Sequence, residues 1–429
     1  MKKMLAGMTI WIVLGAAACA QVSLSSAVDL ALRDSSKVRM AEAEQIRARG
    51  VLTETHAAYI PNLYVGAGLG YSMGFPLGTP NLFNANSQSL VFSFSQPDYI
   101  RSARAALRAA IFSLQDARQQ VILDTATAYL ELDKTNRQIA ALNEAINDAD
   151  QLIAIVGNRV AAGMDSRVEE TRARLTRAQM HLQKIQLGDR AEELRQHISN
   201  LTGLPANSLT LDASSIPAFP DLDISTPSQP TQQNPAVQAA FATADARQYT
   251  AHGDDHQNYL PTFEQIAQYS LFSTFNNYQN YYTSFQQNNF GFEVQIVWPL
   301  FDPIHRAKGI ESDADAIIAR HQALQTKIQV SEKNLALWHQ LRELKAKQEV
   351  ATLKQELAKD TLDSLLTQMQ NGTGSSTAPA VTPRQAEQSR IDERTGYIDM
   401  LDADFEVERV QLGLLRLTGG LEDWVKSQK

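Results

Sequence analysis

Apolar and polar residues alternate with a period of two in several short segments, as in β-strands whose two faces meet different surroundings. Residues 63–75 place apolar side chains on one face and mostly glycine on the other, and residues 290–298 alternate in a similar way. Residues 90–95 also alternate, whereas residues 262–275 do so less regularly. The pattern predicts four strands, arranged as two β-hairpins.

The segments between the paired strands, residues 76–87 and 276–287, are long and rich in Asn, Gln and Tyr. Such composition is typical of solvent-facing loops. Long strands with an aromatic-bearing apolar face match the strands of transmembrane barrels. A half-buried sheet in a soluble domain remains the alternative. If the apolar face meets lipid, the expected lipid-facing strand residues are Leu63, Val65, Leu69, Tyr71, Phe92, Phe94, Phe290, Phe292, Val294 and Trp298.

Outside these strand segments, much of the chain has apolar residues spaced as in an α-helix. From Leu107 to Val156, apolar residues recur at spacings of three and four, which is the spacing of coiled-coil helices. Residues 304–370 are almost free of proline, and as one helix they would extend on the order of 100 Å. Shorter helical segments are predicted over residues 24–58 and 235–258, each ended by a Tyr-x-Pro sequence because proline disfavours a helical residue before it.

The two halves of the chain repeat one another. Tyr59-Ile60-Pro61 recurs as Tyr259-Leu260-Pro261, Gln96-Pro97 as Trp298-Pro299, and Leu201-Thr202-Gly203 as Leu417-Thr418-Gly419. The offsets between these pairs are 200, 202 and 216 residues, so the second repeat gains 14 residues after its hairpin. The Gly/Ser/Thr/Ala/Pro segment of residues 371–383 is the candidate insertion.

The N-terminus has the features of a secretory signal peptide. Lys2 and Lys3 precede an apolar stretch, and Ala18-Cys19-Ala20 fits the A-x-A rule for cleavage before Gln21. Lipidation of Cys19, the only cysteine, is an open alternative. The formal net charge of −8 argues against nucleic-acid binding, and past the signal no apolar run is long enough for a helical membrane span.

The predicted strand number constrains the assembly. Strands in a membrane cannot leave open edges, and the smallest natural barrels have about eight strands. Four strands per chain are therefore too few to close a barrel. If they enter a membrane, identical subunits have to pool their strands, most simply by cyclic symmetry.

The sequence also resembles a known family, the TolC-like outer-membrane efflux proteins. The resemblance covers essentially the whole mature chain and is carried by short motifs in order. These motifs are Leu24, Ala27 and Ala31-Leu32 in the first helix, Asn234-Pro235 at the start of the second repeat, Pro299-Leu300-Phe301-Asp302 after the last strand, and Leu-Thr-Gly at the end of both halves.

The resemblance implies a mainly α fold with β: a duplicated helix–β-hairpin–helix repeat that forms a trimeric 12-stranded outer-membrane β-barrel continued by a long α-helical coiled-coil periplasmic tunnel. The expected division is a signal peptide (1–20), a first repeat (21–203, hairpin about 62–97), a linker or equatorial segment (204–233), a second repeat (234–420, hairpin about 262–299) and a C-terminal tail (421–429).

The implied function is that of an outer-membrane channel subunit in a tripartite efflux or type I secretion system, a passive conduit for small molecules or proteins. The implied partners are two further copies of the chain, a periplasmic adaptor (membrane fusion protein), an inner-membrane transporter and outer-membrane lipid. No catalysis, cofactor, metal or nucleic acid is expected. The competing function is a periplasmic coiled-coil adaptor or scaffold, soluble or lipid-anchored.

In this family the adaptor docks on the helical tips at the periplasmic end, which here match residues 157–163 and 366–383. A plain inter-helix turn is the alternative at each tip. The residues expected at the docking tips are Gly157, Asn158, Arg159, Val160, Gly163, Met369 and Gly372.

The chain departs from the family pattern at two places. Asp34-Ser35-Ser36 replaces the usual Asn-Pro, and residues 366–383 contain no acid to form an acidic entrance. The nearest acids to that tip are Asp360, Asp363 and Glu387.

His252, Asp254, Asp255 and His256 form the densest group of possible metal ligands, with the two histidines at i, i+4 spacing. Gly253 weakens the helix there, and no Glu occupies the H-E-x-x-H position. A polar helix end next to the Tyr259-Leu260-Pro261 break is the simpler interpretation.

Overall fold

The computed structural model describes residues 21–69, 81–220, 234–272, 286–371 and 382–427. The described chain is mostly helical with some sheet, as predicted. Its α-helices are α1 (Leu24–Asp34), α2 (Ser36–Ala57), α3 (Gln96–Ala161), α4 (Arg167–Thr202), α5 (Pro235–Tyr259), α7 (Pro303–Asn371), α8 (Pro383–Thr418) and α9 (Leu421–Lys426). Its strands are β1 (Gln21–Val22), β2 (Tyr64–Ala67), β3 (Asn81–Ser93), β4 (Thr210–Leu211), β5 (Thr262–Phe272) and β6 (Asn288–Val297). Two 3₁₀ turns, Ala206–Ser208 and Ala213–Ser215, flank β4.

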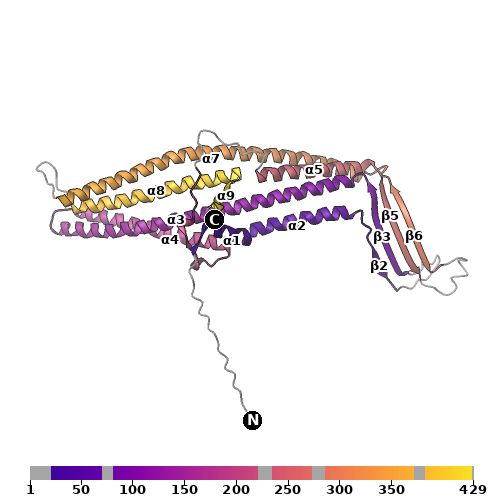
Figure 1. Cartoon of the computed structure of the whole chain (residues 1–429), viewed down its shortest axis with the longest axis horizontal. Helices are drawn as coiled ribbons and strands as arrows, with labels where there is room; N and C mark the ends of the chain where they lie inside the picture. Colours follow the sequence, from indigo (N-terminus) through magenta and orange to yellow (C-terminus); the bar gives the residue numbers. More distant parts are fainter. Residues whose placement is uncertain (1–20, 70–80, 221–233, 273–285, 372–381, 428–429) are drawn as a thin grey trace, which may run out of the picture. The chain divides into compact units, whose positions relative to one another are not determined.

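Four strands form one antiparallel sheet in the order β2-β3-β5-β6 (Figure 1). Each repeat contributes one antiparallel pair, and the long β3–β5 ladder joins the two pairs. The sheet therefore contains strands from both halves of the chain, with β2 and β6 at its outer edges.

Part of the first hairpin differs from the sequence prediction. Residues 81–87 were predicted to lie in a polar loop, but they form the first half of β3 and pair with β5. The prediction was wrong because polar residues such as Asn84 and Asn86 were taken as a sign of a loop, whereas here they fill one face of a strand. Strand β2 is shorter than predicted and ends at Ala67, and residues 70–75 lie outside the described residues.

The helices also differ from prediction at one point. The helical segment predicted over residues 24–58 is two helices, because Ser35 takes an extended conformation between them (φ −61°, ψ 126°). Its backbone N–H still donates to the Ala31 carbonyl at 2.9 Å, and its carbonyl accepts from the Arg39 N–H at 3.1 Å. In the described part of the chain, none of the helices contains an apolar stretch long enough to cross a membrane.

The repeat motifs correspond to helix ends. Gly203 and Gly419 both lie just after a long helix in the left-handed conformation, with φ of 73° and 84°. Glycine adopts this conformation without the steric cost that a Cβ atom adds, and the turn satisfies carbonyls at the helix end. Asn234 caps α5, since its side chain accepts from the Ala236 N–H at 3.1 Å and Pro235 follows at the first helical position.

The chain divides into two compact units, each built from separate segments. The first contains Met1–Arg39, Arg118–Pro230 and Glu332–Lys429, and the second contains Met40–Ala117 and Thr231–Ser331. Helices α3 and α7 contribute residues to both.

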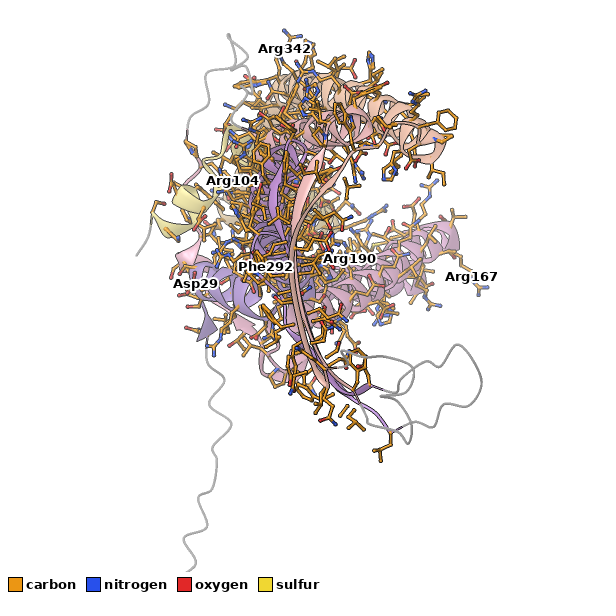
Figure 2. All side chains as sticks on the ribbon, turned by 90° about the vertical axis from the view of Figure 1, so that its right-hand side faces the viewer. Asp29, Arg104, Arg167, Arg190, Phe292 and Arg342 are labelled. Carbon is orange, nitrogen blue, oxygen red and sulfur yellow. The ribbon has the colours of Figure 1, made fainter. Side chains whose placement is uncertain are left out.

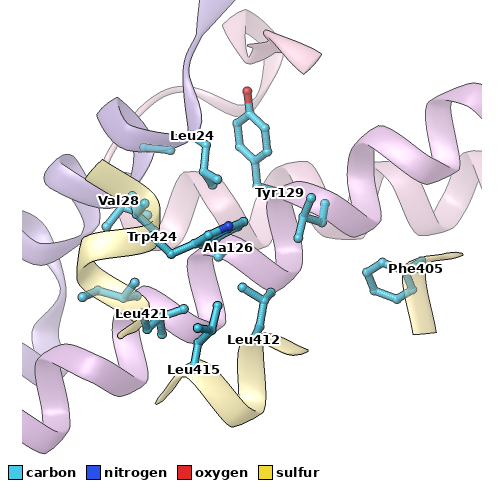
Figure 3. Close-up of a cluster of buried hydrophobic side chains, with 13 residues drawn as sticks. Leu24, Val28, Ala126, Tyr129, Phe405, Leu412, Leu415, Leu421 and Trp424 are labelled. Atoms are coloured by element: carbon cyan, nitrogen blue, oxygen red, sulfur yellow. The ribbon is translucent and has the colours of Figure 1, made fainter. Parts of the chain in front are cut away.

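A buried cluster holds the first unit together where α1, α3, α8 and α9 meet (Figure 3). Leu24, Leu412 and Leu421 are fully buried in it, and Trp424 stacks on Phe219 with ring centroids 4.7 Å apart. Burying side chains of this size contributes about 1.5–3 kcal/mol each.

Tyr129 ties this cluster to the two-stranded sheet of β1 and β4. Its ring is fully buried, and its hydroxyl lies 2.7 Å from the Val22 carbonyl oxygen, to which it can donate. The Tyr129 hydroxyl oxygen also accepts from the Asp212 N–H at 3.0 Å. Burial raises the pKa of Tyr129, so the hydroxyl keeps its proton for this donation.

One acidic residue of the first unit, Glu408, has a pKa well above its ordinary value. Burial raises the pKa of Glu408 on α8 to about 7, and the nearby carboxylates of Asp404 and Asp133 act in the same direction. The Arg137 guanidinium acts against them, but it is engaged by Asp133 at 2.7 Å. The folded state therefore favours a protonated Glu408 more than the unfolded state does.

We expect Glu408→Gln to stabilise the protein at pH 8 by on the order of 1–3 kcal/mol and to have little effect at pH 4.5. Because the folded-state pKa is raised, the cost of ionising Glu408 appears as pH rises above its ordinary value near 4.5 and is complete above about 7. Thermal unfolding midpoints of both proteins across this pH range measure the effect. Glu406→Gln, which removes an acid paired with Arg409 on the same helix, is the control. A gain that does not grow with pH contradicts the expectation.

Candidate functional site

The sheet has two chemically different faces, which the strand register defines. Residues directly opposite one another in an antiparallel ladder point to the same side. One side, called the apolar face here, consists of Val65, Ala67, Phe83, Ala85, Ser87, Ser89, Phe92, Phe263, Gln265, Ala267, Tyr269, Leu271, Asn288, Phe290, Phe292, Val294 and Ile296. The other side, called the polar face, includes Asn84, Asn86, Gln88, Thr262, Glu264, Gln268, Ser270, Glu293 and Gln295.

The apolar face is open to its surroundings. Phe290, Phe292 and Val65 are 72%, 60% and 61% exposed, and Figure 2 labels Phe292 on β6. Aromatic rings contact one another across the strands, with Phe83 edge-on to Tyr269 at a centroid distance of 6.1 Å. An exposed apolar surface of this kind marks a site of contact with lipid or protein.

Five of the predicted lipid-facing residues, Val65, Phe92, Phe290, Phe292 and Val294, lie together on the apolar face. Four others, predicted as strand residues, lie just outside the strands. These four exposed residues are Leu63, Leu69, Phe94 and Trp298. Tyr71 lies outside the described residues.

An irregularity in β3 corrects one assignment of faces. Simple alternation put Leu90 and Phe92 on the same face, but Leu90 is opposite Glu264 and Phe92 is opposite Phe263. The register shifts between them, so Val91 is an extra residue. Phe92 then reaches Phe94, with ring centroids 4.9 Å apart.

The tip between α3 and α4 is tighter than the sequence indicated. Helix α3 continues to Ala161, so Gly157, Asn158, Arg159 and Val160 lie in its last turns and not in the connecting loop. The turn itself forms at Gly163, which has φ of 71° and donates its N–H to the Val160 carbonyl at 3.0 Å.

Ion pairs join this tip to the start of α8, a connection that the sequence did not reveal. The Arg159 guanidinium donates to both carboxylate oxygens of Asp165, at 2.8 and 3.2 Å. Arg384 contacts Asp165 at 3.6 Å and also hydrogen-bonds Glu169. The hydrogen bond from Arg159 lowers the pKa of Asp165, so this carboxylate stays ionised. Arg384 is far from Asp165 in sequence, and no local pattern indicates that the two meet.

The second tip is described only at its two ends. Met369 lies in the last turn of α7 and is 39% exposed, whereas Gly372 lies outside the described residues. Helix α8 begins with a capping box, in which the Thr382 N–H donates to Gln385 Oε1 at 2.9 Å and Thr382 Oγ1 accepts from the Gln385 N–H. The sequence Thr-x-x-Gln was a readable signal for this helix start.

Glu387, one of the acids near this tip, is buried and not free to line an entrance. Its carboxylate accepts from Arg390 at 3.1 and 3.3 Å. Burial raises the pKa of Glu387, and the Arg390 charge opposes that shift.

The His/Asp group at the end of α5 is engaged in hydrogen bonds. Asp254 accepts from the Tyr99 hydroxyl at 2.6 Å and from Ser312, and His256 Nδ1 lies 2.8 Å from Asp98 Oδ2. Gly253 is required there because a Cβ atom would lie 2.7 Å from the Tyr99 ring. Within the described ranges, no group of three or more His, Cys, Asp or Glu side chains is arranged to hold a metal ion.

Comparison with known proteins shows which family the first half of the chain resembles. The model of the outer membrane efflux protein family matches residues 27–204. No curated protein matches the sequence significantly.

Solved structures extend the likeness to nearly the whole chain. The CmeC outer membrane channel of Campylobacter jejuni is 14% identical, with a TM-score of 0.76 over 94% of this chain and 89% of that one. The MtrE outer membrane channel of Neisseria gonorrhoeae, in its open state, is 13% identical, with a TM-score of 0.76 over 93% and 89%. The outer membrane protein VceC of Vibrio cholerae is 16% identical, with a TM-score of 0.73 over 93% and 96%. At these identities the likeness establishes a shared fold.

The family match covers the first repeat, and the shared fold covers both repeats with their sheet and long helices. The solved structures that share this fold are outer-membrane channels. The chain thus matches the outer membrane efflux protein family over residues 27–204 and shares the fold of outer-membrane channels over nearly its whole length.

Proposed function

We propose that three copies of this chain form a passive conduit across the outer membrane, as the channel subunit of a tripartite efflux or type I secretion system. The observation that carries the proposal is the four-stranded sheet with one exposed apolar face and two outer strands, β2 and β6, that pair with no further strand among the described residues. Three such sheets joined edge to edge make a closed 12-stranded barrel, which leaves no strand edge in lipid.

The faces of the sheet agree with this arrangement. In a membrane barrel the outward residues are apolar and the inward residues are polar. Phe290, Phe292 and Val294 would then meet lipid, while Gln268 and Gln295 on the polar face would meet the water-filled lumen. The lipid-facing role extends to the exposed flanking residues Leu63, Leu69, Phe94 and Trp298, and by sequence to Tyr71.

The helical tips are the proposed docking sites for a periplasmic adaptor, which would link the conduit to an inner-membrane transporter. One tip presents Gly157, Asn158, Arg159, Val160 and Gly163, and the other presents Met369 and, by sequence, Gly372. The Arg159–Asp165–Arg384 ion pairs give these tips a defined shape. The conduit acts without covalent chemistry, since its partners supply the energy for transport.

The assembly is tested by purifying the chain from membranes in mild detergent and measuring its mass by light scattering. We expect a trimer that stays in the membrane fraction and changes its migration on a gel after heating. Recovery as a soluble monomer without detergent would instead support the competing function of a periplasmic adaptor or scaffold. That outcome would overturn the proposal of a channel.

The lipid-facing assignment predicts that Val65→Arg and Phe292→Arg impair membrane assembly. An arginine facing lipid near the midplane costs about 2–4 kcal/mol. Gln268→Arg, on the polar face of the same sheet, is the matched control and should assemble normally. The yield of heat-modifiable trimer in outer-membrane fractions measures the outcome. Normal insertion of both apolar-face variants would reject the assignment.

The docking proposal predicts that Gly163→Ala lowers export while trimer yield is unchanged. Gly163 has φ of 71°, and an alanine there costs about 1–2 kcal/mol of backbone strain although its Cβ meets no atom within 4 Å. Gly188→Ala in α4 is the matched control because that position is helical, equally open and outside the docking tip, so helix stability should rise by about 1 kcal/mol and export should be normal. Export of a fluorescent dye from cells measures the effect. Normal export by the Gly163 variant removes this tip from the docking site.

A further inference from the structure

The two hairpin segments carry very little charge, and all of it has one sign. Residues 59–97 contain no Asp, Glu, Lys, Arg or His, and residues 257–301 contain only Glu264 and Glu293. Any charge on the sheet therefore comes from these two carboxylates. No cationic side chain in either segment offsets them.

The register puts both glutamates on the same side of the sheet. Glu264 of β5 lies opposite Gln295 of β6, and Glu293 of β6 lies opposite Ile266 of β5. Both belong to the polar face, two positions apart along the ladder, which is about 7 Å. A shift of register by one residue would have put them among the aromatic residues of the other face.

The side chains beside these glutamates carry no charge. The Gln88 side chain on β3 donates from Nε2 to Glu264 Oε2 at 3.0 Å, which orients the carboxylate without cancelling its charge. Glu293 is exposed, and its neighbour Gly291 leaves the space beside it open, with no atom within 4 Å of a Cβ built there.

We infer that Glu264 and Glu293 make the outer part of the conduit selective for cationic over anionic solutes. This inference rests on the proposed function, because threefold assembly would turn two carboxylates per chain into a belt of six around the lumen. Rings of acidic side chains raise the local concentration of cations and repel anions. The two uncompensated carboxylates of each chain lie within a Debye length of about 10 Å at 0.1 M salt and so act together, and they are screened at 1 M.

The inference is tested on the full-length protein reconstituted into planar bilayers, with the K⁺/Cl⁻ permeability ratio taken from reversal potentials in a KCl gradient. We expect a ratio above one in the wild type that falls at least about twofold in Glu264→Gln/Glu293→Gln. Gln295→Lys, which adds a cation opposite Glu264, should lower the ratio as well. The preference should also weaken as the salt concentration rises.

The control is Glu356→Gln, which removes an exposed acid of α7 and leaves the sheet unchanged. An unchanged permeability ratio in the double glutamate variant, or an equal fall in the α7 control, overturns the inference while leaving the conduit intact. A wild-type protein that forms no conducting trimer overturns the proposed function, and the inference with it.

Discussion

The backbone hydrogen bonds at the two edges of the β2-β3-β5-β6 sheet constrain everything else in this protein. Within lipid, an unpaired N–H or C=O group costs several kcal/mol, so a four-stranded sheet with free outer strands cannot remain alone there. The ten residues of β6 present one such edge. In the proposed trimer, β6 would pair with β2 of another copy and so remove this cost, which would make assembly a condition of membrane insertion.

The duplication of the chain supplies the sheet in a form that can be closed. The β3–β5 ladder covers nearly the full length of both strands, so the two hairpins form one continuous sheet within a single copy. The first unit has its own core around Tyr129, Trp424 and Leu24. That core depends on residues from both chain termini and from α3, so the helical part of each subunit can be stable independently of barrel closure.

Sequence patterns predicted the elements that are determined by residues close together in the chain. The 3–4 spacing of apolar residues indicated α3, and the Asn234-Pro235 and Leu-Thr-Gly motifs marked helix ends that the caps at Asn234, Gly203 and Gly419 now explain. Features that depend on distant partners were missed. The Arg384–Asp165 contact joins residues more than 200 positions apart, and the extra residue Val91 is visible only once β3 is paired with β5.

The largest error, taking residues 81–87 for a loop, has a physical explanation that bears on function. In a soluble sheet a strand stretch such as residues 84–89, made only of Asn, Ala, Ser and Gln, would have little apolar area to bury and would be unstable. In a barrel around water the inward positions need polar side chains, and the β3–β5 hydrogen bonds hold the strand whatever its side chains are. The same requirement permits Glu264 and Glu293, which would be costly on a lipid-facing or buried surface. The polar composition that concealed the strand is therefore evidence of what the strand faces.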